Sequence, residues 1–139
     1  MERKYELVKE DIIEFDSVTL YRIRALKDFD TVKAGQLGGY IEKEENLNHY
    51  GNCWVSDNAH VSGDARVFGN TRIFGSAQIF GSAQVSDNSQ IFGNARVSGY
   101  ARVCGDARVF SCARVSGNAQ ISGNACVSGN AQISGNDWV

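Results

Sequence analysis

A six-residue period dominates the chain from Val55 onward. Fourteen consecutive hexads follow one another without an insertion, and the first position of each is always Val or Ile. The fifth position is Ala in 11 of the 14 hexads, the third is Gly in 11, and the fourth is Asn or Asp in 10. A short, strict period of this kind predicts a solenoid, in which each repeat packs only against its neighbours.

Each hexad divides into a short strand and a corner. In a strand such as Ala65-Arg66-Val67-Phe68 the side chains alternate, so Ala and Val point inward while Arg and Phe point outward. The Gly-Asn or Gly-Asp pair supplies the corner, because these residues tolerate positive φ best. Three strands and three corners close one coil of 18 residues, so the 14 hexads predict about 4.7 coils. The sequence contains no Pro, as expected when every coil donates backbone N–H groups to its neighbour.

This repeat, aliphatic-x-Gly-Asn/Asp-small-x over residues 55–139, resembles the hexapeptide-repeat superfamily of left-handed parallel β-helices. The left hand is what the resemblance implies, since most crossovers between parallel strands are right-handed. The segments Lys27–Gly35, Gly38–Ile41 and Gly51–Trp54 look like the N-terminal part of longer, transferase-like members from bacteria, and the chain is also similar to short versions from bacterial and prophage genomes. The expected fold is therefore an all-β, left-handed parallel β-helix with a small N-terminal β cap.

The cap is expected in residues 1–46 and the β-helix in residues 47–139. A solenoid end is an exposed sheet edge, so it needs a cover. The cap residues favour β segments with one turn, and the predicted elements are strands at Tyr5–Val8, Ile12–Phe15 and Thr19–Leu26 and a turn at Asp16-Ser17. A partial hexad that starts at Gly51 begins the stacking and puts Cys53 in the small inward position.

Charge and hydropathy exclude several classes of partner. The 14 basic and 16 acidic residues give a net charge of −2, which argues against a bulk electrostatic grip on nucleic acid or on a membrane surface. The sequence has no apolar run long enough for a transmembrane helix. Its N-terminus is charged and no apolar segment follows, so we expect no signal peptide and a cytoplasmic location with reduced thiols.

The metal-ligating residue types are too few and too scattered for a metal centre. No two cysteines have C-x-x-C spacing, and only two histidines accompany them. We therefore expect no metal and no cofactor. The residues concerned are Cys53, Cys104, Cys112, Cys126, His49 and His60.

The outward positions, six and two of each hexad, sort into three faces when the chain is stacked every 18 residues. The first face carries His60/Ser62, Gln78/Phe80, Arg96/Ser98, Arg114/Ser116 and Gln132/Ser134. The second face carries Arg66/Phe68, Gln84/Ser86, Arg102/Cys104, Gln120/Ser122 and Trp138. The third face carries Trp54/Ser56, Arg72/Phe74, Gln90/Phe92, Arg108/Phe110 and Cys126/Ser128.

The third face is the candidate binding surface because its phenylalanines repeat every 18 residues. They predict an outward aromatic ladder over three coils, which either stabilises neighbouring strands or docks a partner. Phe beside Arg is a mixture typical of interfaces. The partner-binding residues proposed on this basis are Phe74, Phe92, Phe110, Arg72, Gln90, Arg108 and Trp54.

The expected partner is a second copy, in a dimer or trimer, or a foreign protein. Small rigid proteins from phages and other mobile elements can act as inhibitors of host defence proteins, and this chain has the size for such a role. Nucleic acid is disfavoured, because the arginines are spread over all three faces instead of forming one basic stripe.

The alternative function is catalytic. Many members of the superfamily are trimeric acyltransferases with a catalytic His, and here His60 is the candidate base. Its nearest carboxylates in the sequence are Asp57 and Asp64, both at corners, and no inserted loop interrupts the repeats to shape a pocket. A carbonic anhydrase of the β-helical type needs three metal-binding histidines, which one outward His does not supply. The sequence thus favours a non-catalytic binding module over an acyltransferase.

Overall fold

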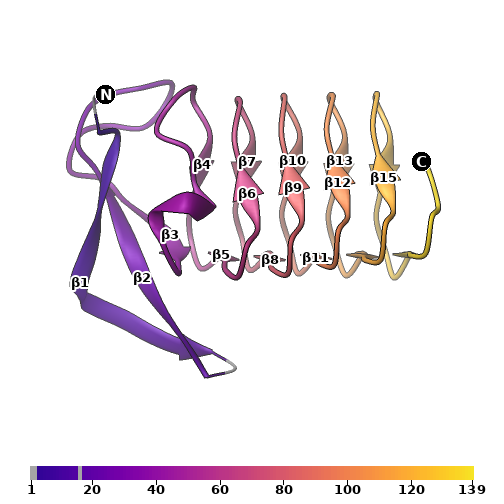
Figure 1. Ribbon diagram of the computed structural model, residues 1–139. Helices are drawn as coiled ribbons and strands as arrows, with labels where there is room; N and C mark the ends of the chain where they lie inside the picture. The colour runs from indigo at the N-terminus through magenta and orange to yellow at the C-terminus, as the bar shows by residue number, and fades with distance from the viewer. Residues whose placement is uncertain (1–2, 16) are drawn as a thin grey trace.

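The computed structural model describes residues 3–15 and 17–139 as a three-sided β-solenoid with a β cap at its N-terminal end (Figure 1). The predicted three faces are confirmed as three stacks of two-residue strands. The first face contains β5 (His60–Val61), β8 (Gln78–Ile79), β11 (Arg96–Val97), β14 (Arg114–Val115) and β17 (Gln132–Ile133). The second contains β6 (Arg66–Val67), β9 (Gln84–Val85), β12 (Arg102–Val103) and β15 (Gln120–Ile121). The third contains β4 (Trp54–Val55), β7 (Arg72–Ile73), β10 (Gln90–Ile91), β13 (Arg108–Val109) and β16 (Cys126–Val127).

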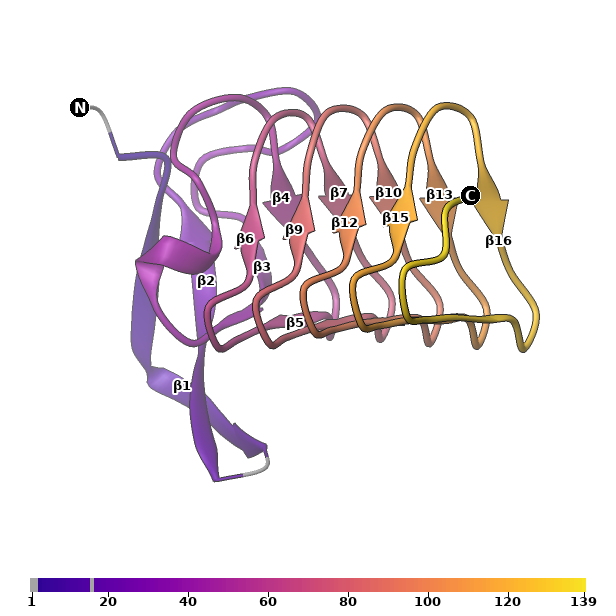
Figure 2. The same cartoon turned by 45° about the vertical axis from the view of Figure 1, so that its right-hand side comes forward.

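Successive coils pair in parallel with a constant offset of 18 residues. On the third face Arg72 pairs with Gln90, and Gln90 pairs in turn with Arg108. The backbone N–H of each coil donates to a carbonyl of the next, as His60 does to Ala77 at 2.9 Å. The second face rises at the front of the molecule and the third descends behind it while the coils advance, so the winding is left-handed (Figures 1 and 2). The expected fold class is therefore confirmed.

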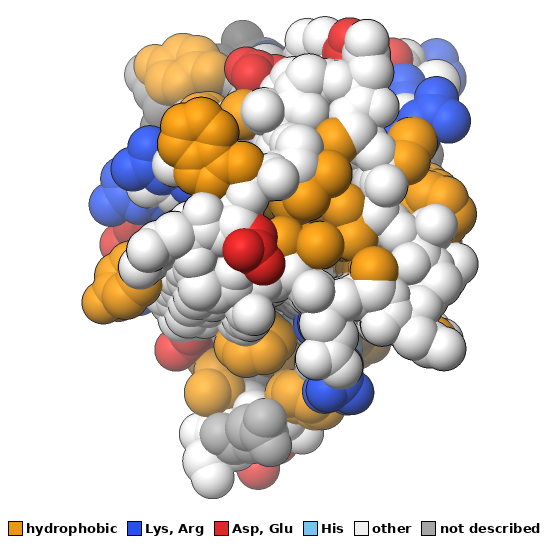
Figure 3. Space-filling view, turned by 90° about the vertical axis from the view of Figure 1, so that its right-hand side faces the viewer, with side chains coloured by type: hydrophobic (Ala, Val, Ile, Leu, Met, Phe, Trp, Pro, Cys, Tyr) orange, Lys and Arg blue, Asp and Glu red, His pale blue; other side chains and the backbone are white. Residues whose placement is uncertain are grey.

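The core is a narrow column of Val, Ile and small side chains. The first-position residues are fully buried through most of the solenoid, as are the alanines of the fifth position. Thr71 and Ser89 replace Ala in two coils, and each hydroxyl donates to a carbonyl three residues earlier, at 2.8 Å and 2.7 Å. In the last coil Ala131 and Ile133 are only partly buried, and Figure 3 shows hydrophobic side chains at the centre of that end.

The corners depend on positive φ. All fourteen third-position residues lie in this region, with φ from 58° at Asp57 to 75° at Gly69. The residues that replace Gly at these corners are Asp57, Asp87 and Ser111. Both aspartates use their side chain there, because the Asp57 carboxylate accepts the N–H of Gly75 at 3.1 Å and that of Asp87 accepts Gly105 at 2.9 Å.

The cap is an antiparallel hairpin that continues into the solenoid. It contains β1 (Tyr5–Phe15), β2 (Val18–Ala25), β3 (Leu37–Ile41) and the short 3-10 helix η1 (Glu44–Asn46). The two segments expected before residue 16 form one strand with an irregularity between Val8 and Ile12. Of the predicted turn, Asp16 lies outside the described residues and Ser17 has a φ of 65°. Within the described residues no helix is long and apolar enough to cross a membrane.

β3 joins the cap to the coils. It runs antiparallel to β2 and parallel to β5, where Tyr40 pairs with His60. Parallel stacking thus begins at Tyr40, inside the segment assigned to the cap. Gly38 is required here, because a Cβ at this position would come within 2.5 Å of the Val55 carbonyl oxygen.

Candidate functional site

The predicted aromatic ladder is present on the third face. The rings of Phe74 and Phe92 stack with centroids 4.8 Å apart and planes 1° apart, and those of Phe92 and Phe110 at 4.9 Å and 2°. This spacing is the distance between adjacent parallel strands, so the coils themselves set it. Each ring is partly exposed. The three side chains therefore form one continuous apolar ridge along the solenoid, which we call the Phe ridge.

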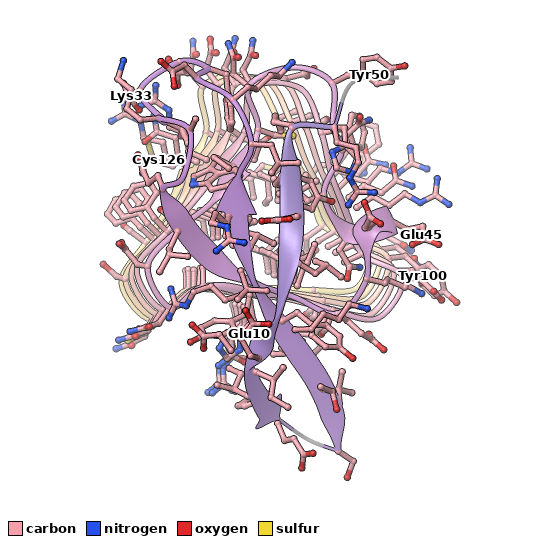
Figure 4. All side chains as sticks on the ribbon, turned by 90° about the vertical axis from the view of Figure 1, so that its left-hand side faces the viewer. Glu10, Lys33, Glu45, Tyr50, Tyr100 and Cys126 are labelled. Atoms are coloured by element: carbon pink, nitrogen blue, oxygen red, sulfur yellow. The ribbon has the colours of Figure 1, made fainter. Side chains whose placement is uncertain are left out.

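Polar side chains flank the Phe ridge on one side. Arg72 is exposed and forms an ion pair with Asp30 of the cap at 2.9 Å. Gln90 is partly buried, and Arg108 is exposed without an ion pair among the described residues. Because Asp30 already pairs with Arg72, Arg108 is the cation of this face that remains available to a partner. Cys126 is the next residue of this column, and Figure 4 places it on the opposite side of the molecule from Tyr50 and Tyr100.

Trp54 does not belong to the exposed surface, which corrects its assignment as a partner-binding residue. It is only 5% exposed, and rings of the cap cover it: Phe29 with centroids 5.3 Å apart and Tyr5 with centroids 6.5 Å apart. Its indole N–H has no hydrogen-bond partner in the described part of the chain. The cap needs an apolar contact on the first coil, and Trp54 provides it.

Buried polar contacts fasten the cap to the first coil. The Lys4 ammonium donates to the Cys53 carbonyl oxygen at 2.7 Å and lies 3.3 Å from its Sγ. Burial lowers the pKa of Lys4 and raises the pKa of the Cys53 thiol. His49 stacks on Tyr5, accepts the Lys4 backbone N–H at its Nδ1, and contacts Glu44 through Nε2 at 2.9 Å. These groups are engaged in holding the N-terminal strand.

His60 lies on the first face, where the end of the β1–β2 hairpin covers it. Its ring contacts Phe15 with centroids 5.3 Å apart and Tyr40 with centroids 5.9 Å apart, both edge to face. Burial lowers the pKa of His60, which favours the neutral imidazole. Neither expected carboxylate partner reaches it, because Asp57 binds Gly75 and Asp64 forms an ion pair with Lys43 at 3.1 Å.

The hairpin and the first face enclose a groove of about 290 Å³. We call it the hairpin groove, and its lining residues are Phe15, Val18, His60, Ser62, Gly63, Gln78, Ile79, Phe80 and Arg96. Only the outward Phe80 pointed to this groove in the sequence, because Phe15 and Val18 precede the repeat by some 40 residues. Figure 2 shows the hairpin extending past the solenoid on the side of β5.

The remaining candidate residues do not converge. All four cysteines are free, with Cys104 partly exposed and Cys112 and Cys126 exposed. In the described part of the chain, no three His, Cys, Asp or Glu side chains gather as a metal site would require.

Comparison with known proteins finds similarity within the repeat. A family model described as the YdcK beta solenoid repeat matches residues 89–102 and 119–135. One relative, described as an uncharacterised acetyltransferase YdcK of Escherichia coli strain K12, is 46% identical over 41 residues. That match covers 30% of this chain and only 13% of the relative. The resemblance to transferase-like hexapeptide-repeat proteins is therefore confirmed for the β-solenoid itself.

Proposed function

We propose that this β-solenoid is a non-catalytic protein-binding and assembly module that presents the Phe ridge to its partner. The observation that carries the proposal is the stacking of Phe74, Phe92 and Phe110 into a partly exposed ridge on a rigid sheet. Contiguous apolar surface of this kind is uncommon on monomers except where they bind something. A ridge fixed by the backbone also loses little conformational entropy on binding.

The contact must extend beyond the ridge. Stable protein interfaces bury about 1,200–2,000 Å² in total, which three half-buried rings cannot supply. Gln90 and Arg108 lie beside the rings and add polar contacts at the rim. Arg72 contributes less, because Asp30 already neutralises it.

The partner is a second copy, in a dimer or trimer, or a foreign protein. A phage or mobile-element protein that inhibits a host defence protein is the narrowest form of this proposal, supported by the rigidity of the stacked coils alone. Nucleic acid and membrane are not proposed as partners. We place the interaction in the cytoplasm, since a reducing compartment suits a chain with four free thiols.

The test is the molar mass in solution, measured by light scattering over a concentration series. We expect the wild type to exceed the 15.2 kDa of one chain, and Phe92→Asp to return it to that mass. Phe68→Asp is the matched control, because Phe68 occupies the same hexad position on the second face.

If the wild type is a monomer, affinity capture then compares the same three proteins. A partner bound by the wild type and by Phe68→Asp, but not by Phe92→Asp, supports a foreign target. Equal behaviour of all three proteins in both measurements would refute the proposal.

A second candidate function is acyl transfer with His60 as the base. Two observations favour it: the relative is described as an acetyltransferase, and His60 lines a groove. Titration with acetyl-coenzyme A tests it. Saturable binding that is lost in His60→Ala would support acyl transfer over the binding module, and the absence of binding would remove this candidate.

A further inference from the structure

The hairpin groove has the composition of a small-molecule site. Its walls are apolar where Phe15 and Val18 of the hairpin face Phe80 of the first face. Its polar side chains are few, as is usual for ligand pockets, in which a small number of polar groups orient the ligand. Its volume lies at the lower end of the range for such pockets, so it suits a ligand smaller than a typical drug molecule.

One polar atom beside the groove lacks a partner. The Nδ1 atom of His60 is buried and forms no hydrogen bond within the described residues. Phe15 and Tyr40 hold the ring in place. Buried polar atoms in folded proteins almost always have a partner, so His60 stands out among the groove residues by its unsatisfied atom.

The charge at the far end of the groove is also uncompensated. Arg96 pairs directly with Arg114 on the next coil. Both are exposed, and neither forms an ion pair with another described residue. Like charges directly opposite in a sheet are destabilising. On the other two faces Gln separates successive arginines, as Gln84 separates Arg66 from Arg102.

We propose that the hairpin groove binds a small organic anion, with its apolar body between Phe15 and Phe80 and its carboxylate toward Arg96. An anion there offsets the Arg96–Arg114 repulsion. The site uses the first face and is independent of the Phe ridge. It shares His60 and the groove with the acyl-transfer candidate, but it requires no chemistry at His60.

The probe is 3-phenylpropanoate, titrated into the full chain and followed by amide NMR. We expect saturable shifts at residues around the groove, with a Kd on the order of 1 mM for a ligand of this size. Arg96→Gln should weaken binding about 10-fold, because it removes a charge-assisted contact. The neutral isostere 3-phenylpropanamide should bind the wild type with a similar loss.

Matched variants keep the fold intact. The chain already has Gln in the column of Arg96, at Gln78 and Gln132. It likewise has Ser in the column of Phe80, at Ser62. Phe80→Ser should also weaken the probe several-fold, whereas Arg102→Gln on the second face should leave its Kd unchanged.

Three results would overturn the site. They are an absence of shifts at the groove up to about 10 mM probe, equal binding of the propanoate and the amide, and equal weakening by Arg96→Gln and Arg102→Gln.

Discussion

The first and third faces are built from the same hexad positions and yet offer different surfaces. On the third face, Phe in the second position of three successive coils produces a ridge whose rings stack on one another. On the first face, Phe80 occupies that position in one coil only, and the hairpin turns the surface into a groove. The repeat supplies rigid, interchangeable positions, and the chemistry of each face comes from departures from the repeat.

Both faces depend on the same positive-φ corners, so a substitution that disrupts one corner should destabilise the whole solenoid. Gly99 has a φ of 66°, and a Cβ there would lie 2.8 Å from the backbone nitrogen of Gly117. We expect Gly99→Val to lower the free energy of unfolding by about 3–4 kcal/mol, because a β-branched side chain is strained at positive φ and its methyl groups crowd the next coil. Urea titration followed by circular dichroism measures it.

The matched control is Gly99→Asp. Asp57 and Asp87 occupy equivalent corners and accept an N–H of the next coil. The Asp variant should therefore lose about 1 kcal/mol or less. Equal losses for Val and Asp would mean that the corner does not discriminate between side chains.

A substitution at Leu20 tests whether ligand binding in the hairpin groove can be lost while the Phe ridge stays intact. It is only 1% exposed on β2, on the same side of the strand as the groove residue Val18. Leu20→Ala should cost about 2–3 kcal/mol and weaken binding of the groove probe. Self-association through the Phe ridge should stay unchanged.

Ile12→Ala on the same hairpin is the control, because Ile12 is 46% exposed. It should have little effect on stability or on the probe. If Leu20→Ala loses both self-association through the Phe ridge and binding of the groove probe, the two faces are coupled.

The features that follow from the period were predictable, and those that depend on the cap were not. Coil length, the three faces and the Phe stack each require only that residue i meets residue i+18. The burial of Trp54 and the position of Phe15 beside His60 depend on contacts between unique segments far apart in the chain. Lys4 is similar: 49 residues separate it from Cys53, and no local pattern pairs them.

Loss of the ring stacking within the Phe ridge should have a smaller effect on the free energy of unfolding. Phe92→Ser removes both ring contacts of the ladder, each worth about 0.2–1 kcal/mol. We expect a loss of about 1 kcal/mol in the free energy of unfolding. Phe68→Ser should cost less, since Ser86 occupies the same column on the next coil and offers no ring. A loss in Phe92→Ser no larger than in Phe68→Ser would mean that the stack contributes nothing to stability.

The smallest effect is a pH dependence confined to the first face. Burial lowers the pKa of His60 in the folded chain, so the unfolded chain takes up the proton first as the pH falls through about 6.5. The free energy of unfolding should therefore decrease as the pH is lowered from about 7.5 to about 5.5. His60→Gln should remove this part of the decrease, because Gln does not titrate and is natural at this position in Gln78. Urea titrations of both proteins at the two pH values measure the difference. Equal slopes would show that the hairpin leaves His60 as well hydrated as it is in the unfolded chain.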